Sequence, residues 1–365
     1  MILQFGAGNF LRAFADLFID EINRSADTPP GPIIVVQSTG KERADALNQA
    51  NGCYHVAIQG FQDGAVVDET IEVASIGRAL HAGSEWDQVI AAAIDPDLSI
   101  ILSNTTEAGL TLEAADTSRG DGAPTSFPAK LLAVLIARHA DHLPGPWIVP
   151  CELIESNGDR LRDLVLEQAA LWEVSKETCL WLSNECLWIN TLVDRIVPGP
   201  PKNHPLSAID PLLLSAEPFA FWAVETDRTD FPLAGHPAVT ISSDITPYTL
   251  RKVRILNGAH TALVCRAAGT GVETVRECLE HPEIGPWLEK LLLEEIVPVL
   301  EGRCDDPAGF SRDVLDRFRN PFLEHSLSAI ALNHDSKVAV RLQPTIDDYR
   351  EKFGKEPPLL SALFQ

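Results

Sequence analysis

The sequence predicts an α/β protein in which a doubly wound parallel sheet is followed by an all-helical C-terminal domain. Short apolar runs alternate with helix-like segments in the first half, which is typical of a parallel sheet covered on both faces. After about residue 245, helix-like segments follow one another with no convincing strand among them. The 365 residues suffice for two domains, which we place at 1–245 and 246–365.

The elements of the first half follow from apolar patterning. The run at 33–36 is β-branched throughout and follows a Pro/Gly cluster, which is typical of a buried strand. Apolar residues at helical spacing predict a helix over 10–22. The same criteria predict strands at 2–5, 98–102 and 147–149, and helices at 42–51, 86–94 and 129–140.

The second half is predicted to be helical. Two stretches rich in proline and other breakers, 198–205 and 229–237, interrupt the alternating pattern before it. Apolar residues at helical spacing then predict helices at 252–268, 272–280, 285–300 and 313–332.

Charge and composition exclude several function classes. Lys and Arg number 29 and Asp and Glu number 52, so the formal net charge is −23. Such a surface repels phosphate backbones and anionic lipid, so we expect no nucleic-acid partner and no membrane role. A local basic pocket can still bind a small anionic substrate.

Targeting and redox signals point to the cytoplasm. Met1 leads directly into an apolar run without the basic and apolar regions of a secretion signal. No apolar run approaches the ~20 residues of a membrane helix. The seven cysteines include no CxxC pair, so we expect reduced thiols rather than disulfides or a zinc site.

A glycine-containing loop connects the first strand to the first helix. Two glycines separated by one residue suit a tight turn and a close backbone approach, and a helix N-terminus attracts a pyrophosphate. The third glycine of GxGxxG is replaced by Leu11, so a structural turn is the alternative to a Rossmann-type dinucleotide site. Arg12 is predicted to reach a phosphate or to be solvated. The predicted cofactor contacts in this loop are Gly6, Gly8, Asn9, Phe10 and Arg12.

Two further strand ends contribute candidate cofactor contacts. The second strand ends at Gln37 without the carboxylate that usually holds the adenosine ribose, which leaves NAD and NADP both open. Lys41 and Arg43 are candidates for a 2′-phosphate or are surface charges of a helix. Asn104 and Thr105 follow the strand at 98–102, where they contact the cofactor or cap a helix with Glu107 closing a capping box.

The most informative segment is the predicted helix that begins at Thr246 and Pro247. At about 100° per residue, Asn257 and His260 lie about 140° and 80° from Lys252, so all three share one half of the helix. Burial and the neighbouring Arg251 and Arg254 would lower the lysine pKa enough for general acid/base work. The alternative is an ordinary basic helix face.

These motifs together resemble the mannitol dehydrogenase family of polyol-specific long-chain dehydrogenases. The K-x-x-x-x-N-x-x-H helix follows a GxGxFxR-like loop, and 190–198 matches the family pattern N-x-x-V-D-R-I-x-P. Several stretches look closest to the tagaturonate reductase branch: 8–14, 103–109, 126–131, 150–154, 251–261 and 317–322.

The resemblance implies a metal-independent hydride transfer between NAD, with NADP not excluded, and a keto-hexuronate such as tagaturonate. It implies that Lys252 is the general acid/base, that Asn190 and Asn257 donate hydrogen bonds to the substrate oxygen, and that His260 orients the substrate or the lysine. A hexuronate also needs cations for its carboxylate. The predicted substrate contacts are Lys337 and Arg319, with Arg254 and Lys130 as further candidates.

Three positions depart from the mannitol branch of the family. Ala329 and Leu332 replace an arginine and a histidine that contact sugar, and Thr249 replaces a glutamate of a proton path. The alternatives within the family are therefore a mannitol 2-dehydrogenase, a fructuronate reductase or a polyol-phosphate dehydrogenase. A nucleotide-binding protein without catalysis is the alternative from another class, and the assembly state stays open.

Overall fold

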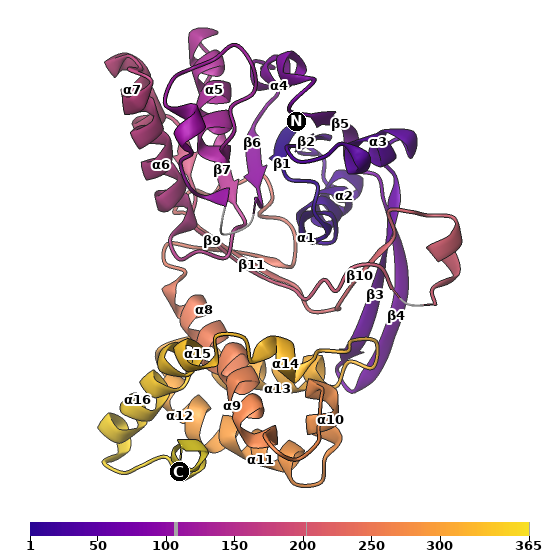
Figure 1. Ribbon diagram of the computed structural model, residues 1–365, viewed down its shortest axis with the longest axis vertical. Coiled ribbons are helices and arrows are strands. Elements are labelled where there is room, and N and C mark those ends of the chain that lie inside the picture. Colours follow the sequence, from indigo (N-terminus) through magenta and orange to yellow (C-terminus); the bar gives the residue numbers. More distant parts are fainter. Residues whose placement is uncertain (106–108, 202, 365) are drawn as a thin grey trace. The chain divides into compact units, whose positions relative to one another are not determined.

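The computed structural model describes residues 1–105, 109–201 and 203–364, and these form two compact units (Figure 1). The first unit comprises Met1–Ala57, Thr70–Ala216 and Ala220–Ile245. The second comprises Thr246–Gln365 and two segments from earlier in the chain, Ile58–Glu69 and Glu217–Phe219.

A six-stranded sheet forms the centre of the first unit. Its strand order is β5-β2-β1-β6-β7-β8, and each neighbouring pair is parallel. The central strands are buried along their whole length, which explains their continuous apolar sequences. The strands are β1 (Ile2–Phe5), β2 (Ile33–Gln37), β5 (Ile76–His81), β6 (Ile100–Ser103), β7 (Trp147–Pro150) and β8 (Leu187–Trp188).

Helices of the first unit connect and cover these strands. Ser126 caps α5 by accepting from the Ala129 N–H, and Pro128 lies in its first turn. The predicted single helix at 10–22 is wrong, because the backbone leaves helical geometry at Phe14 (φ −127°, ψ −92°). The helices are α1 (Asn9–Arg12), α2 (Ala15–Ser25), α3 (Glu42–Gln49), α4 (Trp86–Ala93), α5 (Phe127–Ala140), α6 (Asn157–Leu171) and α7 (Lys176–Asn184).

Two small three-stranded sheets complete the strands of the described chain. One has the order β10-β3-β4 and the other the order β12-β11-β9. The sequence pattern missed β3 and β4. Six of the nine residues of β4 are exposed, so this strand lacks the continuous apolar run of a buried strand, although Asp63 and Gly64 form a positive-φ hairpin turn between β3 and β4. These strands are β3 (Tyr54–Gln62), β4 (Ala65–Val73), β9 (Thr191–Asp194), β10 (Leu214–Ala216), β11 (Phe221–Glu225) and β12 (Val239–Ser242).

From Thr246 onward the described chain is helical, with only isolated β-bridges, so the predicted fold class is confirmed. None of the helices in the described ranges has the length and apolarity to cross a bilayer. The helices are α8 (Thr246–Arg251), α9 (Gly258–Ala267), α10 (Val275–Glu280), α11 (Ile284–Leu291), α12 (Val297–Leu300), α13 (Pro307–Phe318), α14 (Leu327–Ile330), α15 (His334–Arg341), α16 (Gln343–Phe353) and α17 (Pro358–Ser361).

Two predicted helices of this unit differ from the structure. The predicted helix at 313–332 is wrong, because α13 ends at Phe318 and Pro321 follows shortly after. The helix predicted at 285–300 contains a π-helical turn at Leu292–Ile296, immediately before Pro298. A proline inside a helix removes one N–H and crowds the preceding turn, and a π turn relieves both constraints.

The end of α13 anchors the two earlier segments of the chain that join the helical unit. Arg317 donates to Glu217 through Nε (3.0 Å) and Nη2 (2.8 Å), and its guanidinium lies 4.3 Å from the centroid of the Phe219 ring. Both charged side chains are buried, Glu217 to 1% exposure and Arg317 to 4%. The Asn320 amide donates to the Gln59 carbonyl at 3.1 Å.

We expect Glu217→Ala to destabilise the helical unit by about 3–5 kcal/mol, because it removes the bidentate carboxylate partner of the buried Arg317 guanidinium. Urea unfolding measures the change. Asp316→Ala removes one partner of the exposed Asp316–Arg319 pair and is the matched control, with an expected cost of about 0–1 kcal/mol. Equal losses of unfolding free energy in Glu217→Ala and Asp316→Ala would contradict the importance of the buried pair.

Candidate functional site

A cavity of about 590 Å³ opens at the carboxyl ends of β1, β2 and β6. Strand order reverses at β1, which has β2 on one side and β6 on the other, and open α/β sheets bind ligands at such a point. Five of the predicted cofactor contacts line it: Gly6, Gly8, Gln37, Asn104 and Thr105.

The glycine loop forms one wall of this cavity. Gly6 has φ +123°, and a Cβ there would lie 3.0 Å from the Asn104 carbonyl oxygen, so both conformation and space require glycine. A Cβ on Gly8 would meet nothing within 4 Å, so open space lies over this backbone where α1 begins. The loop therefore leaves room for a pyrophosphate beside backbone N–H groups.

Arg12 and Arg43 both hold the loop through hydrogen bonds. Arg12 is 3% exposed and donates to the Leu212 carbonyl (2.6 Å) and to Asn9 Oδ1 (2.9 Å). Burial lowers the pKa of Arg12 to about 10. Arg43 donates to the same Asn9 oxygen (2.9 Å) and to the Ala7 carbonyl (3.1 Å). The expectation that Arg12 is solvated is thus wrong, and its contact with a phosphate stays a prediction.

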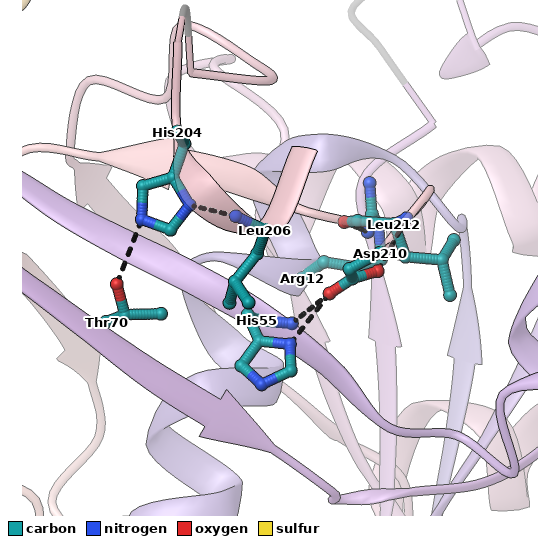
Figure 2. A network of polar contacts seen from close by, with 7 residues as sticks. All are labelled: Arg12, His55, Thr70, His204, Leu206, Asp210 and Leu212. Carbon is teal, nitrogen blue, oxygen red and sulfur yellow. Dashed lines mark hydrogen bonds and ion pairs between the residues drawn. The ribbon is translucent and has the colours of Figure 1, made fainter. Parts of the chain in front are cut away.

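A polar network, which the sequence pattern did not predict, holds the loop that brings Pro211 and Leu212 into the cavity lining; Figure 2 shows this network. Asp210 Oδ2 accepts from the His55 backbone N–H (2.8 Å) and contacts His55 Nδ1 (2.9 Å), while its Oδ1 accepts from the Leu212 N–H (2.8 Å). His204 Nε2 lies 3.1 Å from the Thr70 hydroxyl. Strands β3 and β4 therefore fix this loop.

The part of the cavity beside β2 contains a carboxylate that the sequence pattern did not predict. Glu42 lines the cavity although it stands at the start of α3 rather than at the end of β2. Hydrogen bonds from backbone N–H groups at Glu42 and Lys41 lower the pKa of Glu42. Gln37 accepts from the Ala44 N–H (2.7 Å) and donates to the Thr39 carbonyl (2.7 Å), which holds the turn in between.

The polar residues after β6 are held by a buried acid. Glu152 accepts from the Thr105 N–H (2.8 Å), the Thr105 hydroxyl (3.1 Å) and the Ser103 hydroxyl (3.0 Å). Burial raises the pKa of Glu152. Asn104 donates to the Cys151 carbonyl at 2.7 Å. Glu107, which would close the predicted capping box, lies outside the described residues.

The side-chain amide of Asn190, in the first unit, forms hydrogen bonds through both its nitrogen and its oxygen. Its Nδ2 donates to Asp159 (2.9 Å) and to Glu225 (2.6 Å), and its Oδ1 accepts from the Asp159 N–H (3.0 Å). Both amide hydrogens are thus committed to carboxylates, so a substrate oxygen must replace one of them to be bound. A Cβ on Gly158 would lie 2.4 Å from the Ile189 backbone, so glycine is needed where α6 approaches Asn190.

Lys252, Asn257 and His260 lie along one continuous helix in the second unit. Between α8 and α9, the six residues Lys252–Asn257 form a π-helix, which we call the π segment. Hydrogen bonds in a π-helix join residues five apart, so Lys252 and Asn257 stand one turn apart on nearly the same face. The α-helical spacing assumed from the sequence separated them by about 140°.

The arginines beside Lys252 have other partners. Arg254 donates to Asp348 (2.7 Å) and to the Thr345 hydroxyl (2.6 Å), so a carboxylate compensates its charge. Arg251 donates to the Asp305 carbonyl (3.0 Å) and lies 4.5 Å from the Phe310 ring centroid. The predicted effect of these two cations on the pKa of Lys252 stays a prediction.

His260 is a buried imidazole whose Nε2 has no hydrogen-bond partner among the described residues. It stacks on Phe318 (4.4 Å between centroids) and meets His325 edge-on (4.7 Å). Burial lowers the pKa of His260 well below its usual range, and His325, Arg317, Arg341 and Lys337 lower it further. The imidazole is therefore neutral, and it leaves a buried polar atom available to a ligand.

The predicted carboxylate-binding cations are in different environments. Lys337 on α15 is half-buried within electrostatic reach of His260, and it donates to the Ile330 carbonyl at 2.7 Å. Arg319 instead pairs with Asp316 at the surface (3.2 Å), so its role in substrate binding stays a prediction. Lys130 donates to the Thr125 carbonyl (2.5 Å) in the first unit.

Three further observations concern alternative sites. A second cavity of about 420 Å³ lies against α4 and α5, with Trp86 and Trp172 in its lining, and holds none of the predicted site residues. In the described part of the chain, no group of three or more His, Cys, Asp or Glu side chains is placed to hold a metal ion. All seven cysteines are free.

Two family models match almost the whole chain. The Mannitol dehydrogenase Rossmann domain matches residues 1–234, and the Mannitol dehydrogenase C-terminal domain matches residues 244–363. The altronate oxidoreductase of Bacillus subtilis (strain 168) is 40% identical over 377 residues, covering 100% of this chain and 78% of the relative. That of Yersinia enterocolitica is 39% identical over 382 residues, covering 99% and 77%.

Solved structures show the same fold. A D-sorbitol dehydrogenase in substrate-free form has a TM-score of 0.86 at 22% identity, covering 100% of this chain and 78% of that one. The Pseudomonas fluorescens mannitol 2-dehydrogenase, in a ternary complex with NAD and D-mannitol, has a TM-score of 0.77 at 23% identity, covering 100% and 77%.

We expect the buried, neutral His260 to make stability fall below about pH 6.5. Because its folded pKa lies below the unfolded value, the unfolded state binds more protons there, and acid favours unfolding by about 1.4 kcal/mol at about pH 5.5. Urea unfolding at about pH 7.5 and about pH 5.5 measures how much unfolding free energy is lost on acidification. This loss should be smaller in His260→Gln than in the unsubstituted protein. An identical loss in both proteins would contradict a buried, neutral His260.

Proposed function

The chain belongs to the mannitol dehydrogenase family, and from that premise we propose that it is an NAD-dependent reductase of a keto-hexuronate, tagaturonate being reduced to altronate. The family resemblance predicted from the motifs is confirmed. The chain is a dehydrogenase that acts on CH–OH groups of polyols or sugar acids. We propose the exact substrate, the coenzyme and the roles of the residues.

One observation carries the choice of a sugar acid over a neutral polyol. In a chain with a net charge of −23, the buried His260 lies within electrostatic reach of Lys337 and Arg341, and neither cation pairs with a carboxylate among the described residues. Local positive charge of this kind in an acidic protein favours an anionic substrate. The relatives of 39–40% identity are named altronate oxidoreductases, and altronate carries a carboxylate.

A nicotinamide coenzyme supplies the hydride in this chemistry, and the residues of the first unit fit one. The open space over Gly8, the N–H groups where α1 begins and the position at the strand-order reversal suit a pyrophosphate. Asn104 and Thr105, held by Glu152, would lie along the coenzyme at the end of β6.

Glu42 favours NAD over NADP. An ionised carboxylate in the adenosine end of the cavity accepts from a ribose hydroxyl and repels a 2′-phosphate. Arg43 also lines the cavity, but its Nη1 is engaged with Asn9 and the Ala7 carbonyl, and Lys41 is exposed outside the cavity lining.

Lys252 would provide the proton that the substrate oxygen needs as hydride reaches the carbonyl carbon. Asn257, one π-helical turn away, would donate a hydrogen bond to the same oxygen as negative charge develops. His260, neutral and without a partner at Nε2, would hold a substrate hydroxyl. Lys252 would then regain its proton from solvent, since Thr249 provides no carboxylate relay one turn before it.

We expect Lys252→Ala to lower kcat for tagaturonate reduction by about 10²–10⁴-fold, because the oxygen loses its proton donor. Loss of NADH absorbance measures turnover, and NADH fluorescence should report an unchanged coenzyme affinity. Lys290→Ala is the control, since that lysine pairs with Glu294 on the surface. Near-normal turnover in Lys252→Ala would overturn the proposed role.

We expect Glu42→Gln to improve NADPH affinity relative to NADH by about five- to tenfold, because a repulsive charge is removed from the cavity. Fluorescence titration with each coenzyme measures both affinities without turnover. Asp45→Asn makes the same charge change on the same helix but outside the cavity lining, and should leave the ratio unchanged. Equal ratios in Glu42→Gln and the unsubstituted protein would speak against this selection.

A further inference from the structure

Helix α15 lies antiparallel to α9 and is tied to it at both ends. At its start, His334 Nε2 lies 3.2 Å from Cys265 Sγ. At its end, Arg341 Nη1 donates to the Thr261 hydroxyl at 3.4 Å. Thr261 follows His260 directly, so α15 presents residues 334, 337 and 341 along the helix that carries the imidazole.

Lys337 and Arg341 stand one helical turn apart on this face, and both are half-buried. Other cations of the same unit are compensated by acids: Arg254 and Arg303 pair with Asp348, and Arg317 pairs with Glu217. No carboxylate among the described residues pairs with either Lys337 or Arg341. Their hydrogen bonds go to the Ile330 carbonyl and, at a long 3.4 Å, to a hydroxyl.

An uncompensated guanidinium that is half-buried requires an explanation in an acidic protein. Burial lowers the pKa of Arg341, which shows that its surroundings disfavour the charge. A single long hydrogen bond to Thr261 leaves most of its five N–H donors unused by the described side chains. An anionic ligand that takes up these donors accounts for both features.

We propose that Arg341, together with Lys337, binds the carboxylate of the sugar-acid substrate and so makes the enzyme specific for uronates over neutral ketoses. A guanidinium matches a carboxylate with two parallel hydrogen bonds, whereas a lysine acts as a point charge beside it. The inference rests on the proposed function, because it assigns the charged end of that substrate to α15.

This placement divides the substrate between two neighbouring elements of the helical unit. The carbonyl end would face Lys252 and Asn257 of the π segment, and the carboxylate would face α15. The end of α15 lies next to α9 here, since a Cβ placed on Gly258 would be in van der Waals contact with the Arg341 carbonyl oxygen at 3.7 Å. His260, between the two ends, would contact the hydroxyls of the chain.

The test compares Arg341→Gln, Arg341→Lys and the unsubstituted protein in steady-state reduction with NADH. For Arg341→Gln we expect the KM for tagaturonate to rise about 10- to 100-fold, kcat to change little, and the kcat/KM for fructose to stay the same. Arg341→Lys should recover part of the loss. Arg312→Gln, which removes an exposed arginine from α13, should match the unsubstituted protein.

Calorimetric titration with altronate in the presence of NAD gives a readout without turnover. An unchanged altronate affinity in Arg341→Gln, or an equal loss for tagaturonate and fructose, would overturn the carboxylate assignment while leaving the proposed function intact. If the unsubstituted protein neither reduces tagaturonate nor binds altronate, the proposed function itself fails, and this inference falls with it. A melting temperature unchanged in Arg341→Gln excludes misfolding as the cause of a loss.

Discussion

The buried ion pair between Arg317 and Glu217 is the constraint on which the helical half of the site depends. Two charges taken out of water are costly, and only a bidentate geometry with a nearby aromatic face offsets that cost. Arg317 is followed directly by Phe318, whose ring stacks on His260. The pair that anchors Glu217–Phe219 to α13 thereby also fixes the surface against which the imidazole rests.

Departures from regular geometry occur where the predicted catalytic residues lie. The π segment brings Lys252 and Asn257 to nearly one face, although an α-helix of the same sequence would separate them. Gly158 lets the start of α6 approach Asn190 closely enough for the Asp159 N–H to orient its amide. Local exceptions of this kind are frequent at functional sites, where geometry is more important than intrinsic propensity.

The sequence predicts the framework of both units because strong local signals specify it. Continuous β-branched runs predict the central strands, and the glycine loop marks the cavity at their carboxyl ends. Other features depend on contacts between distant residues. Glu42 enters the cavity from a helix start, the exposed β4 has no apolar pattern, and the motif at 317–322 does not show that Arg317 is buried while Arg319 is exposed. The pairing of Asn190 with two carboxylates likewise depends on tertiary structure.

The central claim is that an acidic dehydrogenase has a locally cationic site for a sugar acid. The measurement that tests it most directly is the ratio of kcat/KM values for tagaturonate and fructose, determined side by side with NADH. The account predicts a ratio of at least about 100, since a charge-assisted carboxylate contact is lost with the neutral sugar. A ratio of one or less would contradict it and would assign the enzyme to a neutral polyol.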